Sequence, residues 1–420
     1  MDSDTEMDEH GQIRLPPDAR QDLGPGGTGR VDVEVREGHV VLTPSPHRLR
    51  RVYIEVTDRC NLDCRTCMRN VWDKEQGGFL PLALFRKLLR EAASLTGPVE
   101  LFFGGYGEPL LHPHILTMIQ ETKAEGFPAS LISNGMLLSP EVSERLIAAG
   151  LDTLWVSIDG ARPESYGDVR LGAELSGVIE NLKYLQSVRR KTYGSARWAS
   201  KPELGISFVA TRRNIRELPA VIALGQRLGA TRFFVTNLLP HREEQLQNIL
   251  YRPLLDHVPP EAERDPRMRL SLPRFPSSTL PAGSLRVYQN RDCRTDINGA
   301  HLDRKFPRCP FLDRGAAAVR WDGALSPCLP LLHTHPFYLD DRKHLSHAYH
   351  IGNLSDRTLP DLWQDKAYRD FRGALTNFSF SPCTSCNSCD MADHNLEDCL
   401  GNEHPACGTC LWAQGLIRCP

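Results

Sequence analysis

The sequence lacks long apolar runs and has no excess of charge of either sign. None of its 420 residues lies in an apolar stretch of the roughly 20 residues that a membrane-spanning helix needs. The first ten residues, MDSDTEMDEH, are acidic, whereas a secretory signal combines positive charge with an apolar run. Fifty basic side chains nearly balance 52 acidic ones, so the net charge is -2. These absences argue against a membrane protein, a secreted protein and a protein that mainly binds nucleic acid, and they predict a cytoplasmic location.

Cysteine is absent between Cys67 and Cys293 but abundant on both sides of this gap. Three cysteines fall within residues 60–67, and ten fall between residues 293 and 419. Because a reducing cytoplasm disfavours disulfides, such clusters predict metal binding. The second group lies in a loop-rich stretch with little apolar packing of its own, which we expect a bound metal to hold together.

Between residues 52 and 236 the sequence alternates short apolar strands with helical stretches. Phe85, Leu88, Leu89 and Ala92, for example, recur at helical spacing. This alternation predicts an α/β fold, in which a parallel sheet curves into a partial (β/α)6 barrel of the TIM type. Six strands are predicted, over residues 52–57, 99–103, 129–133, 152–158, 204–210 and 231–236.

Cys60, Cys64 and Cys67 follow the first predicted strand in a CxxxCxxC arrangement. Thiolates at such short spacing bind zinc or an iron–sulfur cluster. Three cysteines leave one iron of a four-iron cube without a protein ligand, much as catalytic zinc sites keep one position open. The motif alone leaves the choice between zinc and a cluster undecided.

Glycine-rich and polar segments follow the next three strands. Because the carboxyl ends of barrel strands form one face, these segments and the three cysteines are expected to meet at one mouth. The glycines allow close approach of a ligand, Glu108 can accept from an amine, and Ser157 and Asp159 can accept from ribose hydroxyls or bind an amino acid moiety. The structural alternatives are a surface carboxylate at residue 108, a turn residue at 159 and a packing side chain at Tyr106. The candidate cofactor-binding residues are Gly104, Gly105, Tyr106, Gly107, Glu108, Ser133, Asn134, Ser157 and Asp159.

With these motifs in this order, the chain resembles the radical S-adenosylmethionine (SAM) enzymes. The resemblance implies that Cys60, Cys64 and Cys67 bind a [4Fe–4S] cluster, whose fourth iron is chelated by the amino and carboxylate groups of SAM. It also implies that residues 104–108 orient the methionine amine. One departure from the family pattern is Thr66, which stands before the last cysteine where an aromatic residue is usual.

The same resemblance implies the reaction. An electron from a ferredoxin-like or flavodoxin-like reductant cleaves SAM to methionine and a 5′-deoxyadenosyl radical, which then takes a hydrogen atom from the substrate. Ser157 and Asp159 match the position that contacts the cofactor. The change Asp159→Ala is therefore expected to weaken SAM binding and to leave the cluster intact.

The segment 291–420 resembles the SPASM extension, which binds two auxiliary [4Fe–4S] clusters. Cys309 and Cys328 flank Gly323 at the spacing of that pattern, but the later cysteines depart from it. The sequence therefore leaves open which cysteine serves which cluster and whether Cys293 is a ligand, and zinc ribbons are the alternative. His333, like the other histidines that follow Cys328, is expected to be solvated or hydrogen-bonded within the protein and not a ligand. The predicted auxiliary ligands are Cys309, Cys328, Cys383, Cys386, Cys389, Cys399, Cys407, Cys410 and Cys419.

The N-terminal region is predicted to be a disordered tail (1–10) followed by a β-hairpin unit (11–46), which resembles the AbrB/SpoVT swapped-hairpin domains. Residues 1–50 carry ten acidic and six basic side chains, which favours dimerisation or docking over DNA binding. The barrel is expected over 50–239 and a linker or insertion over 240–290.

Several segments also resemble the maturases paired with tungsten-containing aldehyde ferredoxin oxidoreductases, among them TDRCNLDCRTCMRNVW and FFGGYGEPLLHP. This resemblance implies modification of a tungsten oxidoreductase or its cofactor. The enzyme alternative is a SPASM maturase that crosslinks or oxidises a peptide. The alternative from another class is a zinc-containing, DNA-binding regulator, against which the acidic N-terminus and the barrel motifs speak.

Overall fold

The computed structural model describes residues 48–72, 77–95, 97–194, 201–251, 307–339, 342–384 and 389–420. It also describes the backbone of three short strands, at 31–36, 39–44 and 294–297. The predicted tail, most of the N-terminal unit and residues 252–290 lie outside the described residues. Cys293 and Cys386 lie outside them as well.

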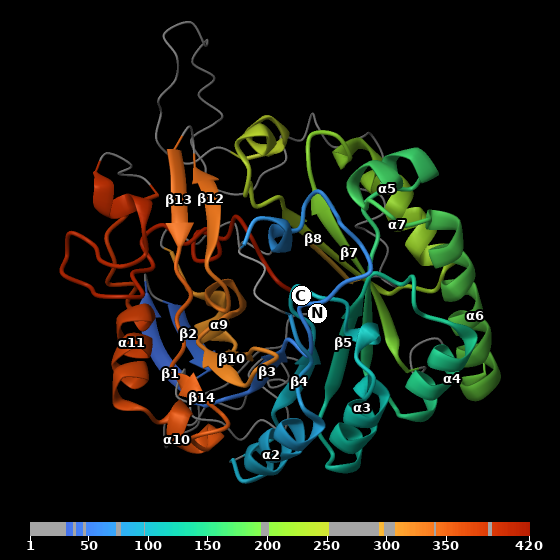
Figure 1. Cartoon of the computed structure of the whole chain (residues 1–420), viewed down its shortest axis with the longest axis horizontal. Helices are drawn as coiled ribbons and strands as arrows, with labels where there is room; N and C mark the ends of the chain where they lie inside the picture. Colours follow the sequence, from blue (N-terminus) through green and yellow to red (C-terminus); the bar gives the residue numbers. More distant parts are fainter. Residues whose placement is uncertain are drawn as a thin grey trace, which may run out of the picture.

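A ten-stranded sheet forms the centre of the molecule (Figure 1). Six of its strands pair in parallel in their order along the chain, which confirms the predicted alternation. They are β3 (Arg51–Ile54), β4 (Glu100–Phe103), β5 (Ala129–Ser133), β6 (Thr153–Ser157), β7 (Glu203–Ala210) and β8 (Arg232–Asn237). The connecting helices are α2 (Leu82–Ala93), α3 (Ile115–Ala124), α4 (Pro140–Ala148), α5 (Pro163–Val169), α6 (Leu175–Tyr193) and α7 (Leu218–Arg227).

The cysteine-rich segment contributes strands to both edges of this sheet. At one edge β10 (Ala316–Val319) pairs in parallel with β3, followed by the antiparallel strands β11 (Ala324–Ser326) and β14 (Gly352–Asn353). At the other edge β9 (Arg294–Ile297) pairs in parallel with β8. The sheet therefore includes strands from both sides of residue 291, where the cysteine-rich segment was predicted to begin.

Alternation along the strands buries both faces of the sheet. Val52 and Ile54 of β3 join the core under the helices, to which α2 contributes the predicted Phe85, Leu88, Leu89 and Ala92. Tyr53 points to the concave face and packs in a second core with residues of the cysteine-rich segment. The Pro420 carbonyl accepts from the Tyr53 hydroxyl at 3.1 Å, so the last residue of the chain lies against β3.

The remaining elements are short and lie mostly outside the barrel. Residues 240–251 belong to the body of the protein, because the Gln245 side chain donates to the Arg65 carbonyl of the cysteine loop at 2.7 Å. The short elements are β1 (Val31–Arg36) and β2 (His39–Pro44), η1 (Met68–Asn70), η2 (Pro109–Leu111), η3 (Ile215–Glu217), η4 (Glu243–Asn248), α9 (Pro310–Asp313), η6 (Leu329–Leu331), β12 (His335–Leu339), β13 (Arg342–Ser346), α10 (Leu359–Trp363), α11 (Lys366–Thr376) and η7 (Asp390–Asp393).

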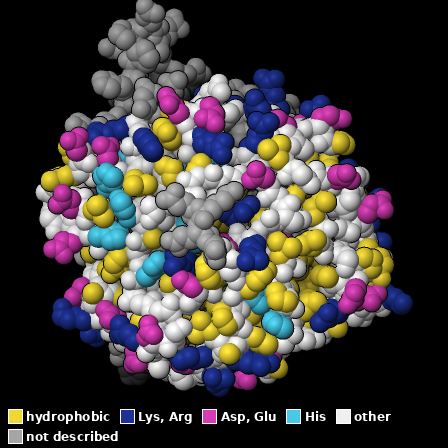
Figure 2. Space-filling model, in the orientation of Figure 1, with side chains coloured by type: hydrophobic (Ala, Val, Ile, Leu, Met, Phe, Trp, Pro, Cys, Tyr) yellow, Lys and Arg dark blue, Asp and Glu magenta, His cyan; other side chains and the backbone are white. Residues whose placement is uncertain are grey.

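Within the described residues, no helix combines the length and the apolar character needed to cross a membrane. On the face shown in Figure 2, basic and acidic side chains are interspersed. The predicted N-terminal hairpin is present, because β1 and β2 pair antiparallel from Val31 opposite Pro44 to Arg36 opposite His39.

Candidate active site and cluster-binding sites

The glycine-rich loop after β4 lies directly against the cysteine loop after β3. The Glu108 backbone N–H donates to the Arg59 carbonyl at 2.8 Å. A Cβ at Gly107 would lie 2.2 Å from the Thr57 carbonyl oxygen, which no side chain tolerates. Glycine is therefore required here for the two loops to approach each other, as the sequence predicts for a crowded mouth.

Glu108 is buried and holds these loops together, while its role as an acceptor for an amine stays a prediction. Its Oε1 accepts from the Leu110 backbone N–H at 3.0 Å and from the Ser133 hydroxyl at 2.9 Å. Its Oε2 accepts from the Asn134 backbone N–H at 2.7 Å. Burial raises the pKa of Glu108, while these three donors favour the ionised form. Glu108 and Ser133 thus join the ends of β4 and β5.

We expect Glu108→Ala to lower the free energy of unfolding by roughly 1–3 kcal/mol, because it leaves buried donors without an acceptor. Because the loops that Glu108 joins would then be less ordered, the variant should also retain less iron after anaerobic reconstitution. Urea unfolding and iron analysis measure both effects. Glu125→Ala, at an exposed glutamate, is the control. Equal stability of the two variants would contradict this role of Glu108.

Asn134 connects the loop after β5 to the first cysteine. Its side-chain N–H donates to Asn61 Oδ1 at 2.8 Å and lies 3.9 Å from Cys60 Sγ. Gly135 follows at φ 80°, a conformation that glycine adopts without strain. The polar residues after β4 and β5 thus gather beside Cys60, where the sequence places them.

Asp159 lies beside Arg170, which in turn contacts the Cys64 thiol. Its side chain is fully buried, and Oδ2 lies 2.8 Å from Arg170 Nη2. Arg170 Nη1 in turn lies 3.9 Å from Cys64 Sγ. Asp159 Oδ1 accepts from the Val209 backbone N–H at 2.7 Å. The expectation that Asp159→Ala weakens SAM binding and leaves the cluster intact stays a prediction. Ser157, the other residue expected to contact the cofactor, is half-buried at the end of β6.

The three thiols have the chemistry of metal ligands. Burial raises the pKa of Cys60 and Cys67 and raises that of Cys64 to about 11. Such thiols are protonated at neutral pH unless a metal provides compensating positive charge. All three are half-buried, so they border the mouth without being sealed from it. These features fit a cluster held by Cys60, Cys64 and Cys67.

A polar group that joins the two halves of the molecule lies beside this mouth. Glu55, fully buried at the end of β3, contacts His333 of the cysteine-rich segment, with Oε1 to Nε2 at 2.8 Å. Glu55 Oε2 also accepts from the Tyr106 backbone N–H at 3.3 Å. The Trp72 ring lies 3.9 Å from the His333 ring, and Tyr106 meets Trp72 edge-on at 5.0 Å. Of the two situations expected for His333, solvated or hydrogen-bonded within the protein, the structure shows the second.

A cavity of about 720 Å³ opens beside this group. It lies between the cysteine loop and the cysteine-rich segment, because both contribute to its walls. Aromatic, cationic and acidic side chains line it together, which suits a polar ligand with an aromatic or planar part. The charged and aromatic side chains of this lining include Asp58, Arg59, Arg69, Trp72, Trp321 and His333.

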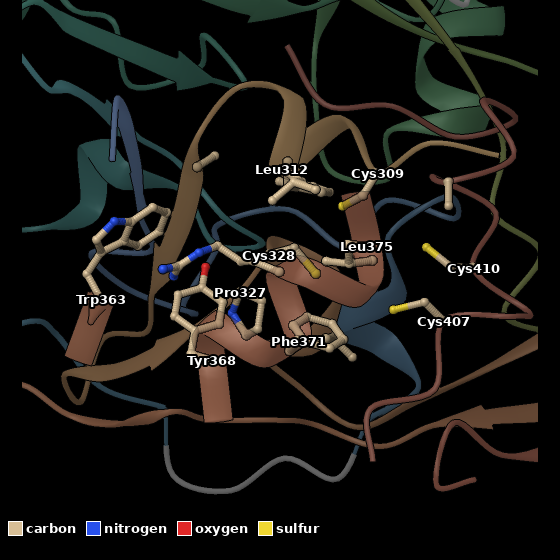
Figure 3. Close-up of a pocket in the computed structure, with 15 residues that line it drawn as sticks. Cys309, Leu312, Pro327, Cys328, Trp363, Tyr368, Phe371, Leu375, Cys407 and Cys410 are labelled. Atoms are coloured by element: carbon tan, nitrogen blue, oxygen red, sulfur yellow. The ribbon is translucent and has the colours of Figure 1, made fainter. Parts of the chain in front are cut away.

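Four predicted auxiliary ligands line one internal cavity (Figure 3). In this view Cys309, Cys407 and Cys410 lie on one side, Trp363 and Tyr368 lie opposite, and Cys328 lies between them. Burial raises the pKa of all four thiols, to about 12 for Cys309, and neighbouring thiols raise the pKa of Cys309, Cys328 and Cys407 further. Within the described residues, no three side chains are close enough to hold a single metal ion.

The remaining cysteines are divided between buried and exposed positions. Cys419 is half-buried near Cys328, and its thiol interacts with the Trp412 side chain. Cys383 is buried, and a Cβ at Gly408 would lie 2.9 Å from its sulfur. Cys389 and Cys399 are exposed, the latter with its sulfur 3.0 Å from the Ser381 hydroxyl.

The fold and the site define a radical SAM enzyme that carries an iron–sulfur SPASM domain. The model of the radical SAM superfamily matches residues 54–195, and that of the SPASM iron–sulfur cluster-binding domain matches residues 309–390. Across 377 residues the chain is 31% identical to the tungsten-containing aldehyde ferredoxin oxidoreductase cofactor-modifying protein of Pyrococcus furiosus. The match covers 89% of this chain and 97% of that protein, and the chain belongs to the same family.

Other comparisons agree at the level of class and fold. The AdoMet-dependent heme synthase of Methanosarcina barkeri is 31% identical over 201 residues, which cover 48% of this chain and 53% of that protein. The crystal structure of Streptococcus suis SuiB bound to S-adenosylmethionine superposes with a TM-score of 0.55 at 16% identity, over 84% of this chain and 72% of that chain. The predicted fold class, the enzyme class and the cofactors, [4Fe–4S] clusters and SAM, are thereby confirmed.

Proposed function

We propose that this enzyme is a maturase that modifies a tungsten-dependent oxidoreductase or the cofactor of such an enzyme. The observation that carries this proposal is the match to the Pyrococcus furiosus cofactor-modifying protein, which extends through the barrel and the cysteine-rich segment alike. A likeness confined to the barrel would support only the shared SAM chemistry. A likeness over 97% of that protein includes the walls of the cavity, where a substrate is selected.

In this proposal Cys60, Cys64 and Cys67 bind the cluster that receives SAM. When bound, the cluster and SAM supply a 5′-deoxyadenosyl radical. Glu108 and Asn134 hold the surrounding loops in place, which keeps the reacting atoms aligned. Trp72 and His333 enclose the mouth and limit the access of water, which protects a reactive intermediate.

The cavity beside the mouth is the proposed substrate site. Arg59 and Arg69 bring positive charge to it, and Asp58 brings negative charge. Trp72 and Trp321 provide flat apolar surfaces for a ring or an aromatic side chain. This lining suits part of a folded protein and an organic cofactor equally, and a protein or peptide target is the proposed partner at this site. A ferredoxin-like or flavodoxin-like reductant is the second proposed partner, because cleavage of SAM requires an electron.

The test is to purify the partner oxidoreductase anaerobically from cells with and without this protein. Mass spectrometry of the partner and of its extracted cofactor should show a covalent difference or a change in tungsten content. A double variant of Cys60 and Cys64 should behave as the deletion does. A partner identical in mass, tungsten content and activity under all three conditions would overturn the proposal. A modification confined to a peptide would support the alternative, a peptide maturase.

The N-terminal unit, residues 11–46, is proposed as a dimerisation or docking module. Deletion of residues 1–46 is expected to leave SAM cleavage largely intact, because every cofactor-binding candidate follows Cys60. The same deletion should convert a dimer into a monomer and impair modification of the partner, since a lone hairpin buries too little surface to be stable by itself. Light scattering and a cleavage assay measure the two effects. A dimeric truncated chain, or one without cleavage, would contradict this division.

A further inference from the structure

Two buried side chains beside Cys64 bear donor groups that have no acceptor. Tyr166 lies on α5 and is fully buried, yet its hydroxyl has no hydrogen-bond partner. Arg170 follows α5 and is also buried, and its Nε–H is equally without a partner. Buried donors are almost always satisfied, because an unpaired buried donor is costly. The buried Asp159 Oδ2, 2.8 Å from Arg170 Nη2, also lacks a hydrogen bond and is an acceptor within reach of the guanidinium. The Tyr166 hydroxyl has no such neighbour that bonds it, and it therefore indicates an acceptor that the described residues do not provide.

The chain fixes both groups against the cysteine loop. The Arg65 backbone N–H donates to the Val169 carbonyl at 2.9 Å, and the Asp63 N–H donates to the Leu171 carbonyl at 3.2 Å. These bonds hold the residues on either side of Arg170 against those on either side of Cys64. The position of Arg170 beside that thiol is therefore built into the backbone.

Asp159 orients the guanidinium further. Asp159 Oδ2 lies 2.8 Å from Arg170 Nη2, and Arg170 Nη1 lies 3.9 Å from Cys64 Sγ. The Asn214 side chain donates to the Asp159 carbonyl at 3.0 Å and fixes the acidic residue in turn. The buried Tyr166 hydroxyl is close enough to Arg170, Asp159 and Cys64 for their charges to affect its pKa. A rigid set of donors, with the guanidinium charge balanced by the Asp159 carboxylate, thus lies beside a single thiol of the motif.

We propose that Tyr166 and Arg170 donate hydrogen bonds to the sulfur atoms of the SAM-binding cluster at Cys64 and raise its reduction potential. The proposal rests on Cys64 as a ligand, and not on the identity of the substrate. Hydrogen bonds and positive charge beside a cluster favour its reduced, more negative state. Such an effect matters in this enzyme because an electron must reach the cluster before SAM can be cleaved.

The test compares Tyr166→Phe and the double change Asp159→Asn/Arg170→Gln with the unchanged protein. Phenylalanine removes only the hydroxyl. The double change removes the Arg170 guanidinium donors together with its ion-pair partner, so that no buried carboxylate is left unpaired and the net charge stays the same. The controls are Tyr184→Phe and Arg162→Gln, at exposed side chains that bond Glu144 and Glu217. The readout is an anaerobic redox titration without SAM, followed by electron paramagnetic resonance of the cluster whose signal SAM perturbs.

Both test variants should shift the midpoint potential of that cluster to more negative values, while iron content and the controls stay unchanged. For all three changes combined we expect the ratio of reduced to oxidised cluster at a fixed potential to fall about tenfold, which is 59 mV for one electron. Unchanged potentials with normal iron content would overturn the proposal. Unchanged potentials with weaker SAM binding would also overturn it, because the donors would then serve SAM and not the cluster. Loss of the proposed function, in contrast, would leave these potentials unaffected.

Discussion

Replacing Cys60, Cys64 and Cys67 together by alanine is expected to abolish SAM cleavage. The three thiols lie in one loop, and the Arg59 carbonyl of this loop accepts from the Glu108 backbone N–H at 2.8 Å. The Asn134 side chain lies 3.9 Å from Cys60 Sγ, and the Arg170 guanidinium lies 3.9 Å from Cys64 Sγ. About four of roughly twelve iron atoms per chain should be lost as well, since a cube holds four.

The measurement combines iron analysis with chromatography of the SAM cleavage products after anaerobic reconstitution and reduction. Cys399→Ala is the matched control for SAM cleavage, because that thiol is exposed and contacts the Ser381 hydroxyl at 3.0 Å. Since Cys399 is a predicted auxiliary ligand, it is not the control for iron content. Cleavage that survives the triple change would show that the catalytic cluster has other ligands.

Replacing Cys407 and Cys410 by alanine is expected to remove a second set of about four iron atoms, since one cube should be lost. Both line the cavity that Cys309 and Cys328 share, and burial raises the pKa of all four thiols, so their ionised form needs a bound metal. They lie beyond residue 390, where the match to the SPASM model ends. The last part of the chain would thus supply half of this site.

The cluster of Cys60, Cys64 and Cys67 should remain in this variant, with its response to SAM. A single change at Cys407 should give the same iron loss as the double change if all four thiols serve one cluster. Full iron content in the double variant would contradict the assignment, and iron loss after Cys399→Ala instead would move the site to the exposed cysteines.

The elements that form the mouth could be predicted because each leaves a local signal. Strands of this type are short apolar runs, and the CxxxCxxC motif and the glycine-rich loop directly follow two of them. The carboxyl ends of parallel strands share an edge, so order along the chain was enough to bring Cys60, Gly107 and Asn134 together. The requirement for glycine at 107 follows from the same crowding.

Other parts of the site have no local signal. Glu55 and His333 are separated by 278 positions, and their contact depends on the way the cysteine-rich segment folds back over β3. Arg170 directly follows the end of α5, and the backbone pairing of its neighbours with the cysteine loop brings it to Cys64. The hydrogen-bond donors to the carboxylates of Glu108 and Asp159 also have no local signal, so the sequence predicted only that these residues bind a ligand. The grouping of Cys309 and Cys328 with Cys407 and Cys410 likewise depends on tertiary packing.

Electron paramagnetic resonance of the reduced protein, recorded with and without SAM, tests the central claim most directly. The claim is that the loop after β3 holds a cluster with one iron free to bind SAM. SAM should change the signal of one cluster in the unchanged protein and in the Cys407→Ala/Cys410→Ala variant, and should change nothing in the triple variant of Cys60, Cys64 and Cys67. A signal that SAM leaves unaltered in the unchanged protein, or that SAM still alters in the triple variant, would contradict the account.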